Sequence, residues 1–203
     1  MKNNTATYYA DILKCTKDLI YGYFPDIVTF MGGALDRELD FTPPKPVPLK
    51  LCRLIPRCIE GTSLETAPLV QSIINASSLL EWQQSYSLDD GFDANYLDNY
   101  GWFNLVSPDG AFLSHDVRIS VGYWGKGLFY KTHWHEPEEI YMPLSGGALF
   151  HSEGAASQTI QPGGFRVHKS NQPHAIDMND TGLLAMAVWR GPNLNRKSAL
   201  PVT

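Results

Sequence analysis

Three residues within one short segment, His133, His135 and Glu139, have the side-chain types and the spacing of a metal-binding site. Side chains alternate between the two faces of a β-strand, so two histidines separated by one residue project to the same side. Residues 136–138 predict a turn, after which Glu139 on the next strand can face the two imidazoles. Two imidazoles and a carboxylate suit a divalent ion such as Zn²⁺ or Fe²⁺. A lone His-x-His pair is more often an ordinary structural feature, so the prediction depends on the surrounding pattern.

A further residue whose side chain could take part in catalysis lies two positions beyond Glu139. Tyr141 shares the strand face of Glu139 and is expected to point toward the same site. A phenol has an unperturbed pKa of about 10, and a nearby dication lowers that pKa by stabilising the phenolate. Such a tyrosine can act as a general base or as a further ligand. A core tyrosine with its hydroxyl bonded to a neighbour is the third interpretation, and the residue pattern leaves all three open.

Residues 1–100 have the sequence features of helices and an irregular arm. Apolar residues recur at helical spacing over 5–24, which predicts a helix there. Five prolines within 41–57 predict an extended arm laid across the rest of the domain. A capping box at residues 62–65 predicts the start of a second helix, which we expect to continue to about residue 84.

The residue pattern changes near Gly101, where short β-prone runs separated by turn residues begin. Many short strands with regular turns indicate a sandwich or a barrel. The expected domain organisation is a cap over 1–100, a barrel over 101–191 and a loose tail over 192–203. The expected strands include 117–123, 127–133, 139–144, 147–151, 164–167 and 183–189.

Composition excludes several classes of function. The chain has 203 residues and a formal net charge of −5, and no basic patch is visible, so nucleic acid and anionic membranes are poor candidate partners. Cys15, Cys52 and Cys58 are too few and too scattered for a disulfide framework or a thiolate zinc site. No apolar run is long enough for a signal peptide or a membrane span, so we expect a cytoplasmic protein. A homodimer is compatible with the sequence.

The segment 127–146 fits the pattern G-x5-H-x-H-x3-E-x6-G at every fixed position and so resembles the first motif of the cupins. The resemblance implies a mainly β chain, a cupin barrel (double-stranded β-helix or jelly roll) with an N-terminal helical cap. After the turn at 161–164, His174 stands where cupins place their last metal ligand, although Gly164 replaces the usual acidic residue. His168 has a position that is normally apolar, so we expect it outside the ligand shell. The implied cofactor is one divalent metal ion, Zn²⁺ or Fe²⁺ first, with Mn²⁺, Co²⁺ and Ni²⁺ compatible with the same ligands.

Two longer runs, 123–130 and 133–141, are similar to the cupin-type dimethylsulfoniopropionate (DMSP) lyases of the DddL and DddQ kind. The segment 91–105 and the helical cap are similar to those of the same lyases as well. The resemblance covers most of the chain from about residue 80 to residue 189. The cupin motif is specific for fold and metal, whereas the flanks rich in Tyr and Trp point to this family.

The resemblance implies a carbon–sulfur lyase that splits a small zwitterion, DMSP, into acrylate, dimethyl sulfide and a proton by β-elimination. It implies His135, Glu139 and His174 as metal ligands, with His133 a ligand or a close neighbour of the ion. Tyr141 matches the base that removes the proton alpha to the carboxylate, and the metal anchors that carboxylate.

Aromatic side chains are expected to line the substrate pocket and to hold the sulfonium by cation–π attraction. Tyr130 and Trp189 match aromatic residues that line the family's pocket, and Tyr123 and Trp134 are further candidates. Plain barrel packing is the competing interpretation for each of them.

Tyr130 conflicts with strict alternation along its strand. Counting from His133, alternation points Phe129 and Lys131 inward and Tyr130 outward. Tyr130 can therefore line the pocket only if the strand has a bulge or bend near Gly127. Otherwise Tyr130 is structural and Lys131 points inward.

The same metal ligands would serve functions of other classes. One is another metal-dependent cupin enzyme, such as a dioxygenase, an isomerase or a lyase for a different substrate. Another is a regulatory cupin without catalysis, which is usually joined to a DNA-binding helix-turn-helix, and no basic recognition helix is visible here. Tyr141 and the aromatic surroundings favour the lyase.

Overall fold

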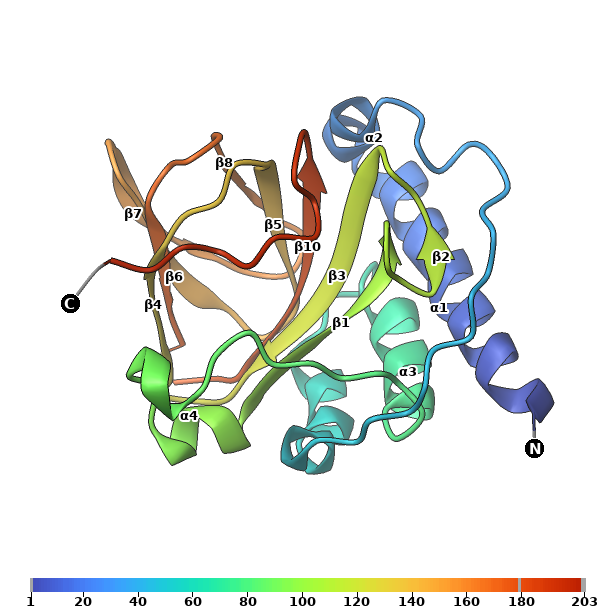
Figure 1. Cartoon of the computed structure of the whole chain (residues 1–203), viewed down its shortest axis with the longest axis horizontal. Coiled ribbons are helices and arrows are strands. Elements are labelled where there is room, and N and C mark those ends of the chain that lie inside the picture. The colour runs from blue at the N-terminus through green and yellow to red at the C-terminus, as the bar shows by residue number, and fades with distance from the viewer. Residues whose placement is uncertain (1, 179, 202–203) are drawn as a thin grey trace.

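The computed structural model describes residues 2–178 and 180–201, in which two β-sheets face each other and helices cover one outer side (Figure 1). The helices are α1 (Lys2–Tyr23), α2 (Pro25–Met31), α3 (Ala67–Ala76) and α4 (Ala94–Asp98), with short 3₁₀ helices at Lys50–Arg53, Ile55–Gly61 and Leu88–Asp90. The strands are β1 (Tyr100–Ser107), β2 (Phe112–Leu113), β3 (Val117–Trp124), β4 (Phe129–His133), β5 (Glu138–Ser145), β6 (Ala148–Ser152), β7 (Ala155–Ile160), β8 (Arg166–His168), β9 (His174–Asp177) and β10 (Leu183–Arg190). Among these described helices, none combines the length and apolar character needed to cross a membrane.

The two sheets form the double-stranded β-helix expected of a cupin. One sheet has the strand order β2-β1-β3-β10-β5-β8 and the other has the order β4-β9-β6-β7. Every pairing in them is antiparallel except that of β1 with β2. The β4–β9 pairing sets His133 directly opposite His174. The prediction of a mainly β cupin barrel with an N-terminal helical cap is confirmed.

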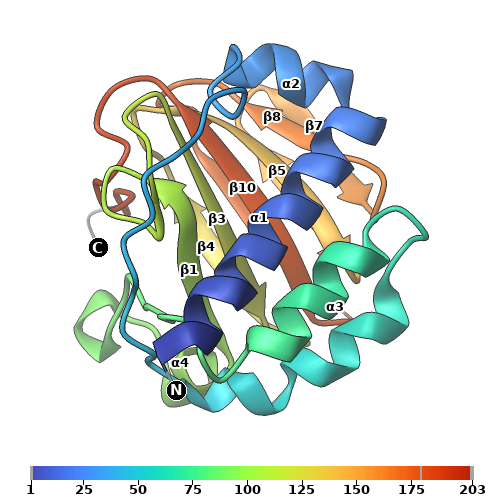
Figure 2. The ribbon, with the colours of Figure 1, turned by 90° about the vertical axis from the view of Figure 1, so that its right-hand side faces the viewer.

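The larger sheet lies between two hydrophobic cores, so strands such as β3 are buried on both faces. On β3, Val117, Ile119 and Val121 pack into the core shared with the helices. Trp124, on the opposite face, belongs to the second core inside the barrel. Figure 2 shows α1 and α3 lying across the outer face of this sheet. The helical layer therefore supports the sheet whose inner face carries the site.

The second predicted helix is shorter than expected. Helix α3 covers Ala67–Ala76, not 62–84. Thr62 caps nothing, because its hydroxyl donates to the Ile59 carbonyl, whereas Ser63 and Thr66 exchange side-chain and backbone hydrogen bonds before the helix. After Ala76 the chain turns into an extended segment that bridges to β1. The capping-box pattern was present, but local hydrogen bonds within a turn used its residues instead.

The remaining secondary-structure expectations are met unevenly. The first helix is observed as α1, and the proline-rich segment is extended only to about residue 49, before two 3₁₀ helices. The six expected strands correspond to β3, β4, β5, β6, β8 and β10. Strand β7 was not predicted, because five of its six residues are exposed and show no apolar alternation.

The backbone conformation at position 146, the last fixed glycine of the motif, requires a glycine. Its φ is +70°, and a Cβ there would lie 2.0 Å from the Gly182 carbonyl oxygen. Gly154 has a similar φ of +76° with nothing within 4 Å of a Cβ.

We expect Gly154→Ala to lower the free energy of unfolding by about 1–2 kcal/mol, the usual penalty of a left-handed residue with a Cβ. Gly146→Ala should cost about 1–3 kcal/mol more, because the clash adds to the same strain. Urea denaturation of both variants measures the difference, and equal losses would show that the clash relaxes without cost.

Candidate active site

Four side chains converge inside the barrel, as the sequence predicts. His133 ends β4, His135 follows it, Glu139 lies on β5 and His174 begins β9, and all four are buried. Glu139 Oε2 lies 3.2 Å from His135 Nε2 and 3.2 Å from His174 Nε2. The rings of His133 and His174 have centroids 4.1 Å apart. The cluster thus brings three imidazoles and one carboxylate to one point.

The backbone fixes the orientation of each imidazole. The Nδ1 atoms of His133, His135 and His174 lie 2.8, 2.9 and 2.8 Å from the carbonyl oxygens of Lys131, Pro137 and Gln172. A carbonyl oxygen only accepts, so each Nδ1 carries a proton, and in the neutral rings that a metal ion binds each Nε2 then presents a lone pair. Such a backbone acceptor behind the ring is the arrangement that typically orients a metal-bound histidine.

The centre of the cluster therefore has acceptor atoms facing acceptor atoms. The Nε2 lone pairs of His135 and His174 face a carboxylate oxygen, and His174 Nε2 has no hydrogen-bond partner among the described residues. Burying such groups without a donor is unfavourable unless a cation lies between them. The donor set and its unpaired nitrogen therefore fit one divalent metal ion.

Electrostatics keep these residues in the protonation states that metal ligation needs. Burial alone would raise the pKa of Glu139, but positive charge and hydrogen bonding on the side of His135 and His174 hold that pKa well below its usual value, and a metal cation bound between these residues would act in the same direction. Burial, together with the neighbouring His174, holds the pKa of His133 well below its usual value. Near neutral pH the carboxyl is therefore ionised and the His133 ring is neutral.

Trp189 supports the cluster from behind. Its indole Nε1 donates to Glu139 Oε1 over 2.6 Å, and its ring stacks on His135 with centroids 4.0 Å apart. This hydrogen bond leaves Oε2 of Glu139 directed at the histidines. The family resemblance implies a role for Trp189 in substrate binding, and the structure places its indole against Glu139 and His135.

Trp189→Phe is expected to lower metal affinity by about 10–100-fold, because the ring stack is kept and only the donor to Glu139 is lost. Trp102→Phe is the matched control, since its indole donates to Ser85 Oγ and touches no member of the cluster. Competition with a chromophoric chelator measures both affinities. Equal affinities in the two variants would contradict a positioning role for Trp189.

His168 lies closer to the cluster than its position in the sequence pattern suggests. It is fully buried, it pairs across the sheet with Glu139, and its ring stacks on His174 with centroids 4.0 Å apart. With Glu139 and His174 it forms a second group of three potential ligand atoms within 4.8 Å of one another. Its exclusion from the ligand shell stays a prediction.

Tyr141 faces the same cavity as Glu139. It is buried, and its ring lies 6.0 Å from Trp124 and 6.4 Å from His168 between centroids. Burial raises its pKa well above the usual value, and the negative charge of Glu139 adds to this. A dication held by the cluster would act in the opposite direction.

A β-bulge resolves the conflict at Tyr130. The β4–β9 register pairs Tyr130 with Ile176 and His133 with His174, so β4 contains one extra residue between these pairs. Tyr130 consequently points inward, stacks on His133 with centroids 3.9 Å apart and lies 3.0 Å from Tyr86 between hydroxyl oxygens.

The alternative, with Lys131 and Phe129 directed inward, is wrong. Lys131 Nζ donates to the Gly91 carbonyl over 2.6 Å on the outside of the barrel, and Phe129 is 47% exposed.

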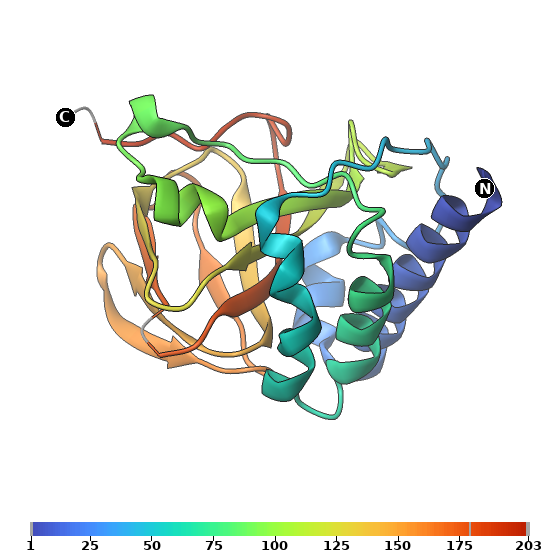
Figure 3. The ribbon, with the colours of Figure 1, turned by 90° about the horizontal axis from the view of Figure 1, so that it is seen from below.

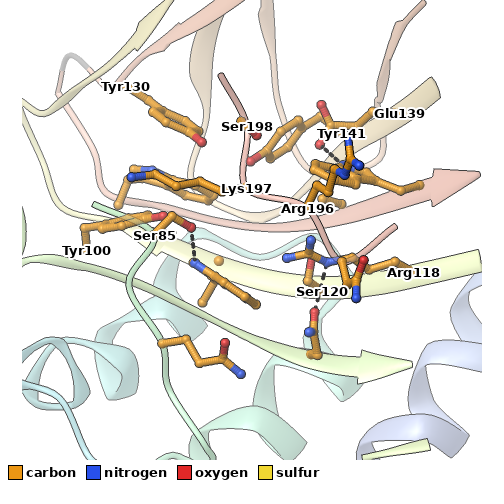
Figure 4. A pocket seen from close by; sticks show the side chains of 18 of the residues that line it. Ser85, Tyr100, Arg118, Ser120, Tyr130, Glu139, Tyr141, Arg196, Lys197 and Ser198 are labelled. Carbon is orange, nitrogen blue, oxygen red and sulfur yellow. Dashed lines mark hydrogen bonds between the residues drawn. The ribbon is translucent and has the colours of Figure 1, made fainter. Parts of the chain in front are cut away.

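Glu139 of the cluster lines a cavity of about 230 Å³, together with Tyr141 and Trp189. Figure 4 shows Glu139 and Tyr141 on one side of it and Tyr100 and Tyr130 on another. Its floor consists of small residues of the large sheet, Ser120, Gly122 and Ala187.

Two of the expected pocket residues lie elsewhere. Tyr123 faces the helical side of β3 and packs in the outer core, because it follows Gly122 and precedes Trp124 on an alternating strand. Trp134 is half-buried outside this cavity and pairs with Ala199 through two backbone hydrogen bonds. The expectation that Tyr123 and Trp134 line the substrate pocket is therefore corrected.

The C-terminal segment is a strap across the cavity, although we expected a loose tail. Residues 195–198 line the cavity, and Lys197 Nζ donates to Asp90 over 3.0 Å. Figure 3 shows this segment on the same side of the barrel as the chain leading into α4. The pairing of Ala199 with Trp134 fixes the end of the strap. Backbone pairing of this kind does not depend on residue type, so the sequence pattern does not predict the strap.

Sequence reasoning missed two polar residues inside the barrel. Tyr86 comes from the irregular segment before α4, where no pattern identifies it. Arg118 lies on β3, and its presence in an otherwise apolar and small-residue strand is a feature that could have drawn attention to it.

Comparisons with known proteins agree with this site. A family model for dimethylsulfoniopropionate lyase matches residues 41–185. The dimethylsulfoniopropionate lyase DddQ of Ruegeria pomeroyi (strain ATCC 700808 / DSM 15171 / DSS-3) is 30% identical over 158 residues, which are 78% of this chain and 78% of that protein.

Solved structures extend the likeness to almost the whole chain. A structure described as one of the DMSP lyases RdDddP and RnDddQII has a TM-score of 0.91 and 30% identity, with 98% of this chain and 100% of that chain covered. The crystal structure of DMSP lyase DddQ from Ruegeria pomeroyi DSS-3 has a TM-score of 0.86 and 28% identity, with 96% of each chain covered. The chain belongs to the dimethylsulfoniopropionate lyase family, a family of carbon–sulfur lyases.

Proposed function

We propose that this chain cleaves DMSP to dimethyl sulfide, acrylate and a proton by metal-dependent β-elimination. The observation that carries the proposal is the buried group of three imidazoles and one carboxylate, whose Glu139 lines the same cavity as Tyr141. Membership of the DMSP lyase family supports the choice of substrate.

His133, His135, Glu139 and His174 would hold the divalent ion. Such an ion supplies positive charge that stabilises a substrate carboxylate as negative charge develops on it and favours the ionised form of a neighbouring phenol. The chain itself positions the ligands through the backbone carbonyls behind each imidazole and through Trp189 behind Glu139.

Tyr141 is proposed as the base. Its phenolate oxygen takes the proton from the carbon alpha to the carboxylate, and the electrons of that C–H bond form the double bond of acrylate. The bond from the beta carbon to sulfur breaks in the same elimination, and its electron pair leaves with sulfur as neutral dimethyl sulfide. The proton on Tyr141 is then released to solvent, so atoms and charge balance.

Aromatic rings at the other side of the cavity are proposed to hold the sulfonium. Tyr130 and Trp124 stack with centroids 5.5 Å apart, and Tyr100 and Tyr86 lie beside them. Ring faces attract a cation without competing for it as a carboxylate would, at about 0.5–2 kcal/mol each. A neutral sulfide loses this attraction, which favours its release.

Incubation of the purified protein with DMSP tests the proposal. Headspace gas chromatography should detect dimethyl sulfide, and proton NMR should detect acrylate in equal amount. The absence of both products with every one of Zn²⁺, Fe²⁺, Mn²⁺, Co²⁺ and Ni²⁺ supplied would reject this function.

A further inference from the structure

Arg118 is a buried cation in the wall of the same cavity. Its side chain comes from β3, is 8% exposed as a residue, and is one of those that line the cavity in Figure 4. Removing a guanidinium from water is costly unless an anion or several acceptors compensate it. The partners of Arg118 therefore indicate what the site is built to receive.

The surrounding residues leave only one edge of the guanidinium available. Trp102 and Trp189 each place a ring centroid 4.7 Å from its central carbon. Nε donates to Asn104 Oδ1 over 3.0 Å, and Nη1 donates to the Leu194 carbonyl over 3.1 Å. Nη2 has no hydrogen-bond partner among the residues that the structure describes. The side chain is therefore held in place, with both N–H donors of Nη2 and one of Nη1 unused.

No carboxylate within the described part of the chain lies at ion-pair distance from Arg118. The charges of Asp109 and Glu139 act on the guanidinium only from beyond ion-pair distance. Asp109 also accepts a hydrogen bond over 3.1 Å from Nδ2 of Asn104, the residue that binds Arg118 Nε. A buried guanidinium that pairs with neutral acceptors alone is suited to an anionic ligand.

The position of Arg118 defines an end of the cavity. Arg118 and Trp124 stand on the inner face of β3 with Ser120 and Gly122 between them, so the cation and the aromatic rings lie at opposite ends of a floor of small residues. Across the sheet, Arg118 pairs with Trp189, and Trp189 pairs with Glu139. The charged end thus lies on the side of the metal cluster.

We propose that the free Nη2 edge of Arg118 binds the carboxylate of the substrate and so determines the orientation of the zwitterion in the cavity. This inference rests on the proposed function for the identity of the substrate, but the carboxylate site itself does not. The guanidinium attracts the carboxylate and repels the sulfonium, while the aromatic end does the opposite. Arg118 is on this account a specificity-determining residue for β-substituted carboxylates.

Two fragments of the substrate separate the ends of the cavity experimentally. Propionate carries the carboxylate alone, and trimethylsulfonium carries the sulfonium alone. Calorimetric titration of the full metal-loaded chain with each fragment is compared for wild type, Arg118→Lys and Arg118→Gln. We expect propionate affinity to fall about 10–100-fold, the effect of a lost charge-assisted hydrogen bond, with trimethylsulfonium affinity unchanged.

Arg37→Gln is the matched control, because it removes the same charge from an exposed position outside the cavity, where Arg37 pairs with Asp116. Screening by water should limit its effect to about threefold. A fall in propionate affinity no larger than that of the control overturns the assignment, and so does an equal fall for both fragments, which would indicate a structural role.

Wild-type protein provides a measurement that does not depend on how the variants fold. In crystals of the metal-loaded chain with propionate, a carboxylate oxygen is expected at hydrogen-bond distance from Arg118 Nη2, and a carboxylate bound elsewhere overturns the inference. If DMSP is not cleaved but propionate binding still depends on Arg118, the carboxylate site stands and the proposed function fails.

Discussion

Tyr141→Phe is expected to lower kcat for DMSP cleavage by about 10²–10⁴-fold while the bound metal is retained. The reason is that the variant keeps the ring, which packs among Trp124, Phe150 and His168, and loses only the oxygen proposed to accept the proton. Steady-state kinetics give kcat, and elemental analysis of the same sample gives the metal content.

Tyr96→Phe is the matched control for this substitution. Its hydroxyl is buried in the same aromatic core and accepts a hydrogen bond from Trp124 Nε1 over 3.2 Å, but it does not line the cavity. We expect its kcat to stay within about threefold of wild type, since one neutral hydrogen bond contributes about 1 kcal/mol to stability and takes no part in the reaction. A Tyr141→Phe protein as active as Tyr96→Phe would remove Tyr141 from the role of base.

Glu139→Gln is expected to abolish stable metal binding and, with it, DMSP cleavage. The replacement keeps the shape of the side chain but removes the only carboxylate of the cluster. The amide that replaces it has one acceptor oxygen and one donor nitrogen, instead of two acceptor oxygens. We expect metal affinity to fall by more than about 100-fold, beyond the range found for residues that only support a ligand. The metal content after dialysis and the rate of dimethyl sulfide release measure the two losses.

Glu138→Gln is the matched control, because it removes one negative charge next to the site without removing a member of the cluster. Glu138 is half-buried and pairs with Arg190 at 2.8 Å on the outside of the barrel, so its loss should leave metal content unchanged and alter stability by about 1 kcal/mol or less. A Glu139→Gln protein that holds one equivalent of metal as tightly as Glu138→Gln would contradict the proposed ligand set.

The core of the site was predictable because its geometry is local. His133, His135 and Glu139 lie within seven consecutive residues, and strand alternation with one turn is enough to bring them together. Gly146 is a similar case, since its left-handed backbone and the carbonyl beside it explain why the motif requires glycine. His174 came from family resemblance, and the structure places it opposite His133 through strand pairing.

Features that depend on register or on backbone pairing were not predictable. The bulge between Tyr130 and His133 shifts alternation by one residue, and only the pairing with β9 reveals it. The strap is fixed by backbone hydrogen bonds between Trp134 and Ala199, which any residue could make. Tyr123 was misplaced because β3 is buried on both faces, so aromatic character alone does not tell which side faces the cavity.

Two layers of the molecule thus have separate tasks. The helices and the outer face of the large sheet form a core in which residues such as Phe103 and Ile119 are fully buried. This layer holds the strands whose inner face carries Glu139, Tyr141 and Arg118. Substitutions in the outer core should therefore change stability first, and substitutions on the inner face should change metal affinity, substrate affinity or turnover first.

The central claim is that one divalent ion, held by His133, His135, Glu139 and His174, is required for DMSP cleavage. The most direct measurement is a titration of chelator-treated protein with Zn²⁺ or Fe²⁺ while dimethyl sulfide release is followed. The account predicts negligible activity without metal and a rise that saturates at one equivalent of ion per chain. Full activity in protein shown to be free of metal, or saturation that Glu139→Gln leaves unchanged, would contradict it.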